Sequence, residues 1–102
     1  MQLQLQNIRQ SFIELQQSIC DELEKLDGKA HFISDVWIRD EGGGGDSRVI
    51  EDGYLFEKGG VNFSHVFGAM PEFLKNESRS SNYFHATGVS IVIHTQNPFV
   101  PI

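Results

Sequence analysis

The run Gly88-Val89-Ser90-Ile91-Val92-Ile93-His94 is the strongest strand signal in this chain of 102 residues. Most of its residues are β-branched and apolar, which is typical of strands. Because side chains alternate along a strand, Ser90 and His94 share one face, about 13 Å apart at roughly 3.3 Å per residue. The other face is apolar, is expected to cover the core, and consists of Val89, Ile91 and Ile93. Ser90 and His94 then need hydrogen-bond partners, which either a neighbouring strand or a ligand supplies.

Three further stretches upstream have strand composition. Residues 32–40 and 61–67 are rich in β-branched and aromatic side chains. Residues 47–58 predict a β-hairpin around Asp52-Gly53, a pair that favours a two-residue turn with positive φ at Gly53. Strands in such close succession predict an antiparallel sheet.

Two glycine runs separate these stretches. Gly42 to Gly45 and the pair Gly59-Gly60 are expected to break the chain between strands. The longer run lacks the spacing of a dinucleotide-binding or phosphate-binding loop. Two interpretations of it stay open: a flexible loop, or a nest of backbone N–H groups that binds a carboxylate. Residues 68–83, with Pro71 and a polar run, predict an exposed loop.

The first 27 residues predict one amphipathic helix. Apolar side chains recur at steps of three and four residues, at Ile8, Phe12, Leu15, Ile19, Leu23 and Leu26. This stripe is expected to pack on the sheet, and Gly28 is expected to end the helix with positive φ. Cys20 lies beside the stripe and is expected to be a small buried side chain. One helix followed by a run of strands predicts an α+β fold, with an N-terminal amphipathic helix packed on an antiparallel β-sheet.

Composition limits the classes of function. Apolar residues make up 39% and charged residues 22%, as in a soluble globular protein, and the length allows one domain. The net charge of −6 comes without a basic run, so neither nucleic acid nor membrane insertion is expected. Cys20 is the single cysteine, which favours a reducing compartment and a cytoplasmic protein.

The four histidines do not follow a known metal-binding spacing. They are His31, His65, His85 and His94. Neither a zinc-finger pattern nor HExxH is present, so a metal site built from them has no support in the pattern.

Three blocks of sequence, taken together, are more specific. They are residues 35–49 (DVWIRDEGGGGDSRV), residues 53–68 (GYLFEKGGVNFSHVFG) and residues 88–101 (GVSIVIHTQNPFVP). In order and spacing they resemble the N-terminal third of the oxygen-dependent coproporphyrinogen oxidases. The likeness covers nearly the whole chain and is weakest over residues 1–30 and 69–83.

The resemblance implies an enzyme of haem biosynthesis. Members of that family convert coproporphyrinogen III to protoporphyrinogen IX by oxidative decarboxylation of the ring A and B propionates to vinyl groups. O2 is the oxidant and co-substrate, and no organic cofactor is used, because the electron-rich pyrroles of the substrate react with O2 themselves. A divalent metal has been proposed for bacterial members.

The resemblance also implies roles for single residues. Ser90 matches a serine that contacts the substrate, and His94 matches a histidine proposed as a metal ligand. Arg39 and Arg48 fall in matched blocks, and at least one is expected to pair a propionate or to fix the glycine run. A structural ion pair with Asp35, Asp40 or Glu41 is the alternative for both arginines. The hairpin Val49 to Lys58 matches a stretch that contributes to the homodimer contact of the family.

In the family, a motif of the form Thr-x-His-x-Asn-x-Arg follows the proline equivalent to Pro101 and supplies the proposed catalytic histidine. Here the sequence stops at Ile102, which stands where threonine is usual. Residues 1–102 are therefore expected to be the N-terminal part of a coproporphyrinogen oxidase domain and to be inactive alone. Two alternatives stay open: a non-catalytic tetrapyrrole-binding or dimerisation module, and a small metal-dependent hydrolase that uses His65, His85 and His94.

Overall fold

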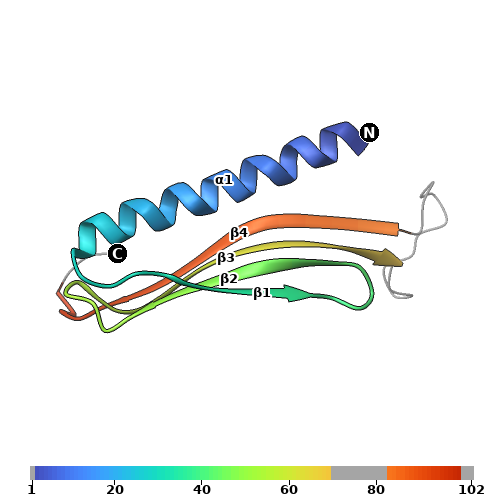
Figure 1. Cartoon of the computed structure of the whole chain (residues 1–102). Helices are drawn as coiled ribbons and strands as arrows, with labels where there is room; N and C mark the ends of the chain where they lie inside the picture. Colours follow the sequence, from blue (N-terminus) through green and yellow to red (C-terminus); the bar gives the residue numbers. More distant parts are fainter. Residues whose placement is uncertain (1, 70–82, 100–102) are drawn as a thin grey trace.

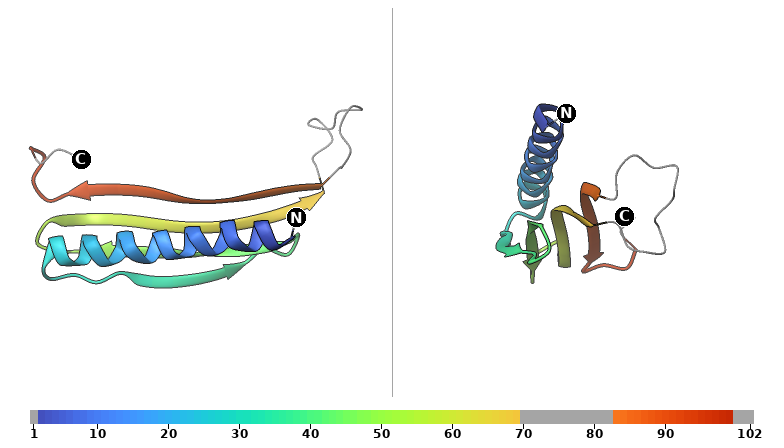
Figure 2. Two further views of the ribbon diagram at one scale, coloured as in Figure 1. Left: turned by 90° about the horizontal axis from the view of Figure 1, so that it is seen from above. Right: turned by 90° about the vertical axis from the view of Figure 1, so that its right-hand side faces the viewer.

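The computed structural model describes residues 2–69 and 83–99, which form one helix on one four-stranded antiparallel sheet (Figure 1). The elements are α1 (Gln2–Asp27), β1 (Ile33–Ile38), β2 (Gly43–Glu51), β3 (Phe56–Ala69) and β4 (Tyr83–Thr95), and the strand order is β1-β2-β3-β4. Helix α1 runs along the length of the strands (Figure 2). It has backbone neighbours in β3 and β4, and its side chains also bond to β2. The predicted α+β fold is confirmed.

The helix ends as its sequence predicts. Gly28 follows the last helical residue with φ of 82°, a conformation that favours glycine, and its N–H donates to the carbonyl of Glu24 at 3.0 Å. Within the described residues, no helix is both long and apolar enough to cross a membrane.

The apolar stripe of α1 meets the sheet only in part. Ile8 and Leu15 are each 45% exposed and Leu26 is 66% exposed, so the prediction that the whole stripe packs on the sheet is wrong. The most buried helix residues are instead Gln16, Cys20 and Asp27, with exposed fractions of 1%, 2% and 4%.

Hydrogen bonds to the sheet explain why the helix turns these residues, and not its apolar stripe, toward the strands. The Nε2 of Gln16 donates to the carbonyls of Asp46 and Val61, at 2.8 and 2.9 Å. A buried amide without such partners would cost free energy, so Gln16 fixes which side of the helix faces the strands. Cys20 is buried as expected, and burial raises the pKa of its thiol.

The glycine runs lie inside strands, so the prediction that they break the chain is wrong. Gly43 to Gly45 begin β2, and Gly59-Gly60 lie within β3. At Gly45 an added Cβ would lie 2.6 Å from Cζ2 of Trp37, which packs across the strand at that point. The absence of a side chain thus allows close approach between neighbouring strands rather than a loop. Gly43 to Gly45 are therefore part of a strand rather than a flexible loop or a nest, and Gly42 lies in the turn before β2.

The connection between β2 and β3 differs from the predicted two-residue turn. It spans residues 52–55, and Asp52 rather than Gly53 takes the positive φ, at 55°. The carboxylate of Asp27 accepts the backbone N–H groups of Tyr54, Leu55 and Phe56, at 2.9 to 3.1 Å. A Cβ at Gly53 would lie 2.5 Å from Cγ of Asp27. The turn is therefore shaped by the helix end as well as by its own sequence.

The core lies between α1 and the middle of the sheet. Its buried apolar side chains are Cys20, Ile50, Phe56, Val61 and Phe63. The strand predicted at residues 61–67 is confirmed and extends over Phe56–Ala69, and the strand predicted at Gly88 to His94 extends over Tyr83–Thr95. The polar loop expected around Pro71 lies outside the described residues.

Candidate functional site

The sheet has two unlike faces. The covered face, under α1, carries Ile50, Val61, Phe63 and His65, because cross-strand partners such as Val61 and Ile91 share a face. The open face, on the side away from α1, carries Asn62, Ser64, Ser90, Val92 and His94. The register thus brings Ser90 and His94 to the same side of the sheet, and both are exposed there.

The strand β3 supplies neighbours for both residues on the open face. Asn62 lies directly opposite Ser90, and Lys58 lies directly opposite His94. Directly opposed residues have Cβ atoms about 4.5–5.5 Å apart, so these side chains are neighbours on the same face. The sequence alone did not predict Lys58 and Asn62 as site residues, because neither belongs to a recognisable motif. Only the strand register places them beside Ser90 and His94.

Two shallow grooves follow β4 along the open face. One has a volume of about 370 Å³ and is lined by Val49, Lys58, Gly59, Gly60, Asn62, Val92 and His94. The next has a volume of about 240 Å³ and is lined by Ser64, Ala86, Thr87, Gly88, Val89 and Ser90. Lys58, Asn62, Ser90 and His94 offer an ammonium, an amide, a hydroxyl and an imidazole, all of which can donate hydrogen bonds to a carboxylate.

Arg39 holds the start of β2 in place. Its Nη1 donates to the carbonyls of Phe67 at 2.7 Å and Gly42 at 3.1 Å, and its guanidinium lies 5.7 Å from the centre of the Phe84 ring. Its Nε also lies 3.4 Å from the Glu41 carboxylate. Arg39 thus contacts Gly42 of the glycine run, and its contact with Glu41 is the structural ion pair that the alternative expected.

Arg48 lies on the covered face, opposite in the sheet to Val61. Its Nε lies 2.8 Å from Oδ2 of Asp46, and its Nη1 donates to Oε1 of Gln17 on the helix at 2.7 Å. The acidic partner is Asp46 rather than any of the three acidic residues expected. The structure does not bring Arg48 together with Ser90.

The histidines are divided between the two faces. His65 and His85 lie on the covered face with ring centres 6.5 Å apart, whereas His94 lies on the open face. The structure therefore does not assemble the three histidines of the hydrolase alternative. Among residues 2–69 and 83–99, no group of three His, Cys, Asp or Glu side chains could hold a metal ion. His94 alone does not make a metal site.

Comparison with known proteins agrees with the sequence blocks. The family model described as coproporphyrinogen III oxidase matches residues 7–102. The oxygen-dependent coproporphyrinogen-III oxidase of Prochlorococcus marinus (strain MIT 9515) is 47% identical over 93 residues. That match covers 87% of this chain and 27% of the curated protein, so the chain spans about a quarter of its relative's length. The chain belongs to the coproporphyrinogen III oxidase family.

Proposed function

We propose that the complete protein containing this chain converts coproporphyrinogen III to protoporphyrinogen IX, by oxidative decarboxylation of the ring A and B propionates with O2. The observation that carries the proposal is the row of hydrogen-bond donors on the open face, made by Lys58, Asn62, Ser90 and His94. A tetrapyrrole with several carboxylates needs such donors, and membership of the family supplies the substrate class.

The chemistry assigns different tasks to the two β4 residues. Ser90 donates its hydroxyl hydrogen to a propionate oxygen and so fixes the position of the substrate. His94 holds or moves a proton beside the substrate, or contributes one ligand to a divalent metal whose other ligands lie outside the described residues. The pyrroles of the substrate supply the electrons to O2, so the protein needs to bind, orient and shield rather than to carry an organic cofactor.

Steady-state kinetics of Ser90→Ala and His94→Ala in the complete protein test these tasks. Loss of the Ser90 hydrogen bond is expected to lower kcat/KM about 5- to 150-fold. Loss of proton transfer at His94 is expected to lower it about 10²- to 10⁴-fold. Ser18→Ala and His31→Ala, which remove an exposed serine and an exposed histidine elsewhere, are matched controls and should keep wild-type activity.

Thermal melts of the same variants separate function from folding. Since Ser90 and His94 are exposed, both variants should melt within a degree or two of the wild type. Wild-type kcat/KM per folded molecule in both variants would reject the site. Metal content, measured after dialysis with and without a chelator, decides between the proton and metal tasks of His94, because only a metal ligand would change it.

The connection between β2 and β3 is the proposed homodimer contact, within Val49 to Lys58. Tyr54 is 72% exposed, and the Asp27 carboxylate accepts a hydrogen bond from its backbone N–H. A large aromatic side chain on a fixed backbone is a suitable interface anchor. Tyr54→Asp should weaken dimerisation of the complete protein in sedimentation equilibrium, whereas Leu26→Asp, at an exposed apolar residue outside the hairpin, should not. Equal dissociation constants for Tyr54→Asp and the wild type would exclude this contact.

A further inference from the structure

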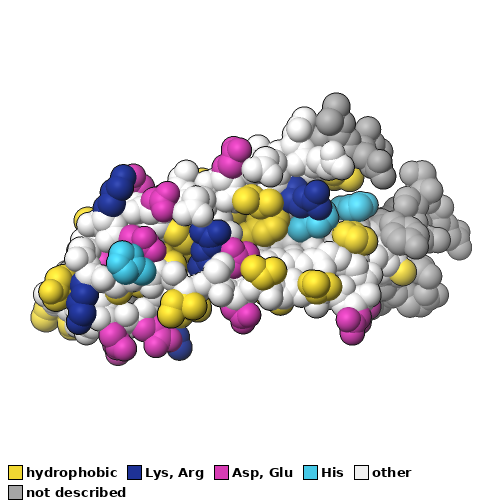
Figure 3. All heavy atoms as spheres, in the orientation of Figure 1, with side chains coloured by type: hydrophobic (Ala, Val, Ile, Leu, Met, Phe, Trp, Pro, Cys, Tyr) yellow, Lys and Arg dark blue, Asp and Glu magenta, His cyan; other side chains and the backbone are white. Residues whose placement is uncertain are grey.

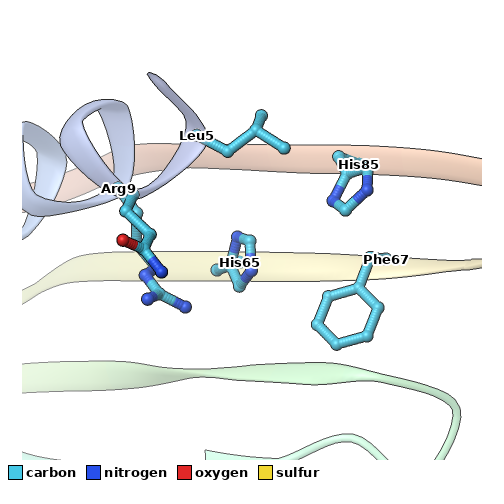
Figure 4. A pocket seen from close by; sticks show the side chains of 6 residues that line it. Leu5, Arg9, His65, Phe67 and His85 are labelled. Carbon is cyan, nitrogen blue, oxygen red and sulfur yellow. The ribbon is translucent and has the colours of Figure 1, made fainter. Parts of the chain in front are cut away.

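A cleft lies on the covered face of the sheet, under the N-terminal half of α1 (Figure 4). Its volume is about 300 Å³, and its described lining consists of Leu5, Gln6, Arg9, His65, Phe67 and His85. The space-filling view shows histidine and cationic side chains side by side in this region (Figure 3). None of these residues takes part in the grooves of the open face.

One polar atom in this cleft is buried without a partner. Nδ1 of His65 forms no hydrogen bond with any described residue. Buried polar atoms in folded proteins are nearly always paired, so an orphaned ring nitrogen at the wall of a cleft points to a missing partner. The ring of His65 is held in place by neighbours, with Phe67 at 5.5 Å and His85 at 6.5 Å between ring centres.

The charge of the cleft is positive. Arg9 reaches into it from the helix, and none of the described residues that line it is acidic. Burial, together with the nearby charge of Arg9 and His85, lowers the pKa of His65. The arginine and two imidazoles therefore repel one another when protonated, and an anion among them would remove that repulsion. A guanidinium beside the two imidazoles also disfavours a metal cation.

We propose that Arg9, His65 and His85 form a binding site for a small oxyanion, a carboxylate or a phosphoryl group, on the covered face. Arg9 offers a planar pair of donors to the oxyanion, and each protonated imidazole adds one more. Leu5 and Phe67 give the cleft an apolar wall, against which a short organic body of the ligand packs. This site is separate from the proposed substrate face and does not depend on it.

The affinity of this site depends on pH. Arg9 of α1 and His85 of β4 are the described charged and titratable groups that face His65, and β2 presents only Gly44 opposite it. Because the pKa of His65 is lowered, its imidazole gains a proton only as the pH falls, and a bound oxyanion favours that protonated form. Oxyanion binding should therefore tighten from pH 8 to pH 5.5.

The test is a titration of the complete protein with inorganic phosphate and, separately, with benzoate, followed by NMR of the histidine ring signals. Saturable shifts confined to His65 and His85 are expected, stronger at pH 5.5 than at pH 8. Arg9→Gln should weaken binding about 10- to 100-fold, the loss of a charge-assisted hydrogen bond. Lys25→Gln removes an exposed cation from the same helix, outside the cleft, and should leave binding unchanged.

Each result decides the proposal. Benzoate binding more tightly than phosphate identifies a carboxylate with an apolar body, and the reverse order identifies a phosphoryl ligand. The proposal is overturned if neither anion shifts His65 and His85, or if Lys25→Gln weakens binding as much as Arg9→Gln. Stoichiometric Zn²⁺ binding to both histidines would overturn it in favour of a metal site. Ser90→Ala should keep anion binding, which separates this outcome from the failure of the proposed enzyme function.

Discussion

The covered face and the open face of the sheet differ in how deeply their side chains are buried. On the covered face, Val61 and Ile50 are buried to 0% and 1% exposure, and the helix above them is held by buried polar groups. On the open face, Ser90, Val92 and His94 remain exposed, with Val92 at 58%. Changes at the buried residues of the covered face should alter stability, and changes on the open face should alter activity.

The covered face also shows that polar contacts can decide how an amphipathic helix lies. Gln16 and Asp27 are nearly inaccessible, although a hydrophobic stripe runs along the same helix. Each of them satisfies backbone groups of the sheet or its turn, which an apolar side chain at that position would leave unpaired.

The largest expected effect on the covered face comes from Asp27→Ala. Its carboxylate accepts N–H groups of Lys29 and Ala30 after the helix and of Tyr54, Leu55 and Phe56 in the turn. Leaving them unpaired should lower the free energy of unfolding by about 2–5 kcal/mol in urea denaturation. Asp21→Ala, at an exposed aspartate of the same helix, should stay within about 0.5 kcal/mol of the wild type. A similar loss in both variants would refute the special role of Asp27.

Lowering the pH should also reduce the free energy of unfolding through the Asp27 carboxylate, by less than Asp27→Ala does. Burial tends to raise the pKa of Asp27, but hydrogen bonds from Ala30, Phe56, Leu55 and Tyr54 outweigh burial and hold the pKa well below its usual value of 3.8. Because the folded pKa is lowered, the stability from Asp27 is complete above pH 3.8 and is lost as the pH falls below it. Urea midpoints between pH 2 and pH 6 should show this slope in the wild type and a shallower one in Asp27→Asn.

A third comparison uses Gln16, whose amide bridges α1 to β2 and β3. Gln16→Leu keeps the bulk of the side chain and leaves the carbonyls of Asp46 and Val61 without this donor, so a loss of about 1–3 kcal/mol is expected. Gln10→Leu, at an exposed glutamine, is the control. An increase in stability in Gln16→Leu would mean that apolar packing, and not the amide, positions the helix.

The smallest effect is expected at Leu15. A fully buried leucine would cost about 2–5 kcal/mol on replacement by alanine. Since Leu15 is 45% exposed, Leu15→Ala should lower the free energy of unfolding by about 1 kcal/mol or less. Urea denaturation measures the change, and a loss of about 2–5 kcal/mol would contradict this partial exposure of Leu15.

The spacing of apolar residues along the chain correctly predicted one strand and the helix. The alternation from Val89 to His94 placed Ser90 and His94 on one face, and the 3–4 spacing of α1 predicted its extent and its end at Gly28. These features depend on neighbours in sequence, so the sequence contains them directly.

Features that depend on distant partners were not predictable. Gly45 lies in a strand because Trp37 packs against it, and the Asp52 turn takes its shape from Asp27. Similarly, Lys58 joins the candidate site only through the β3–β4 register opposite His94. A glycine or an aspartate has the same local preferences whether or not such a partner exists.

The contact between Asp27 and residues 54–56 closes a segment that contains all of β1 and β2. Closing a segment of that length costs conformational entropy, which is offset when β1 and β2 inside the segment pair with their neighbours. Docking of the helix and pairing of β2 with β3 are therefore parts of one cooperative unit. The amides of this surface turn should exchange with solvent as slowly as those of the central strands, because releasing them requires that whole unit to open.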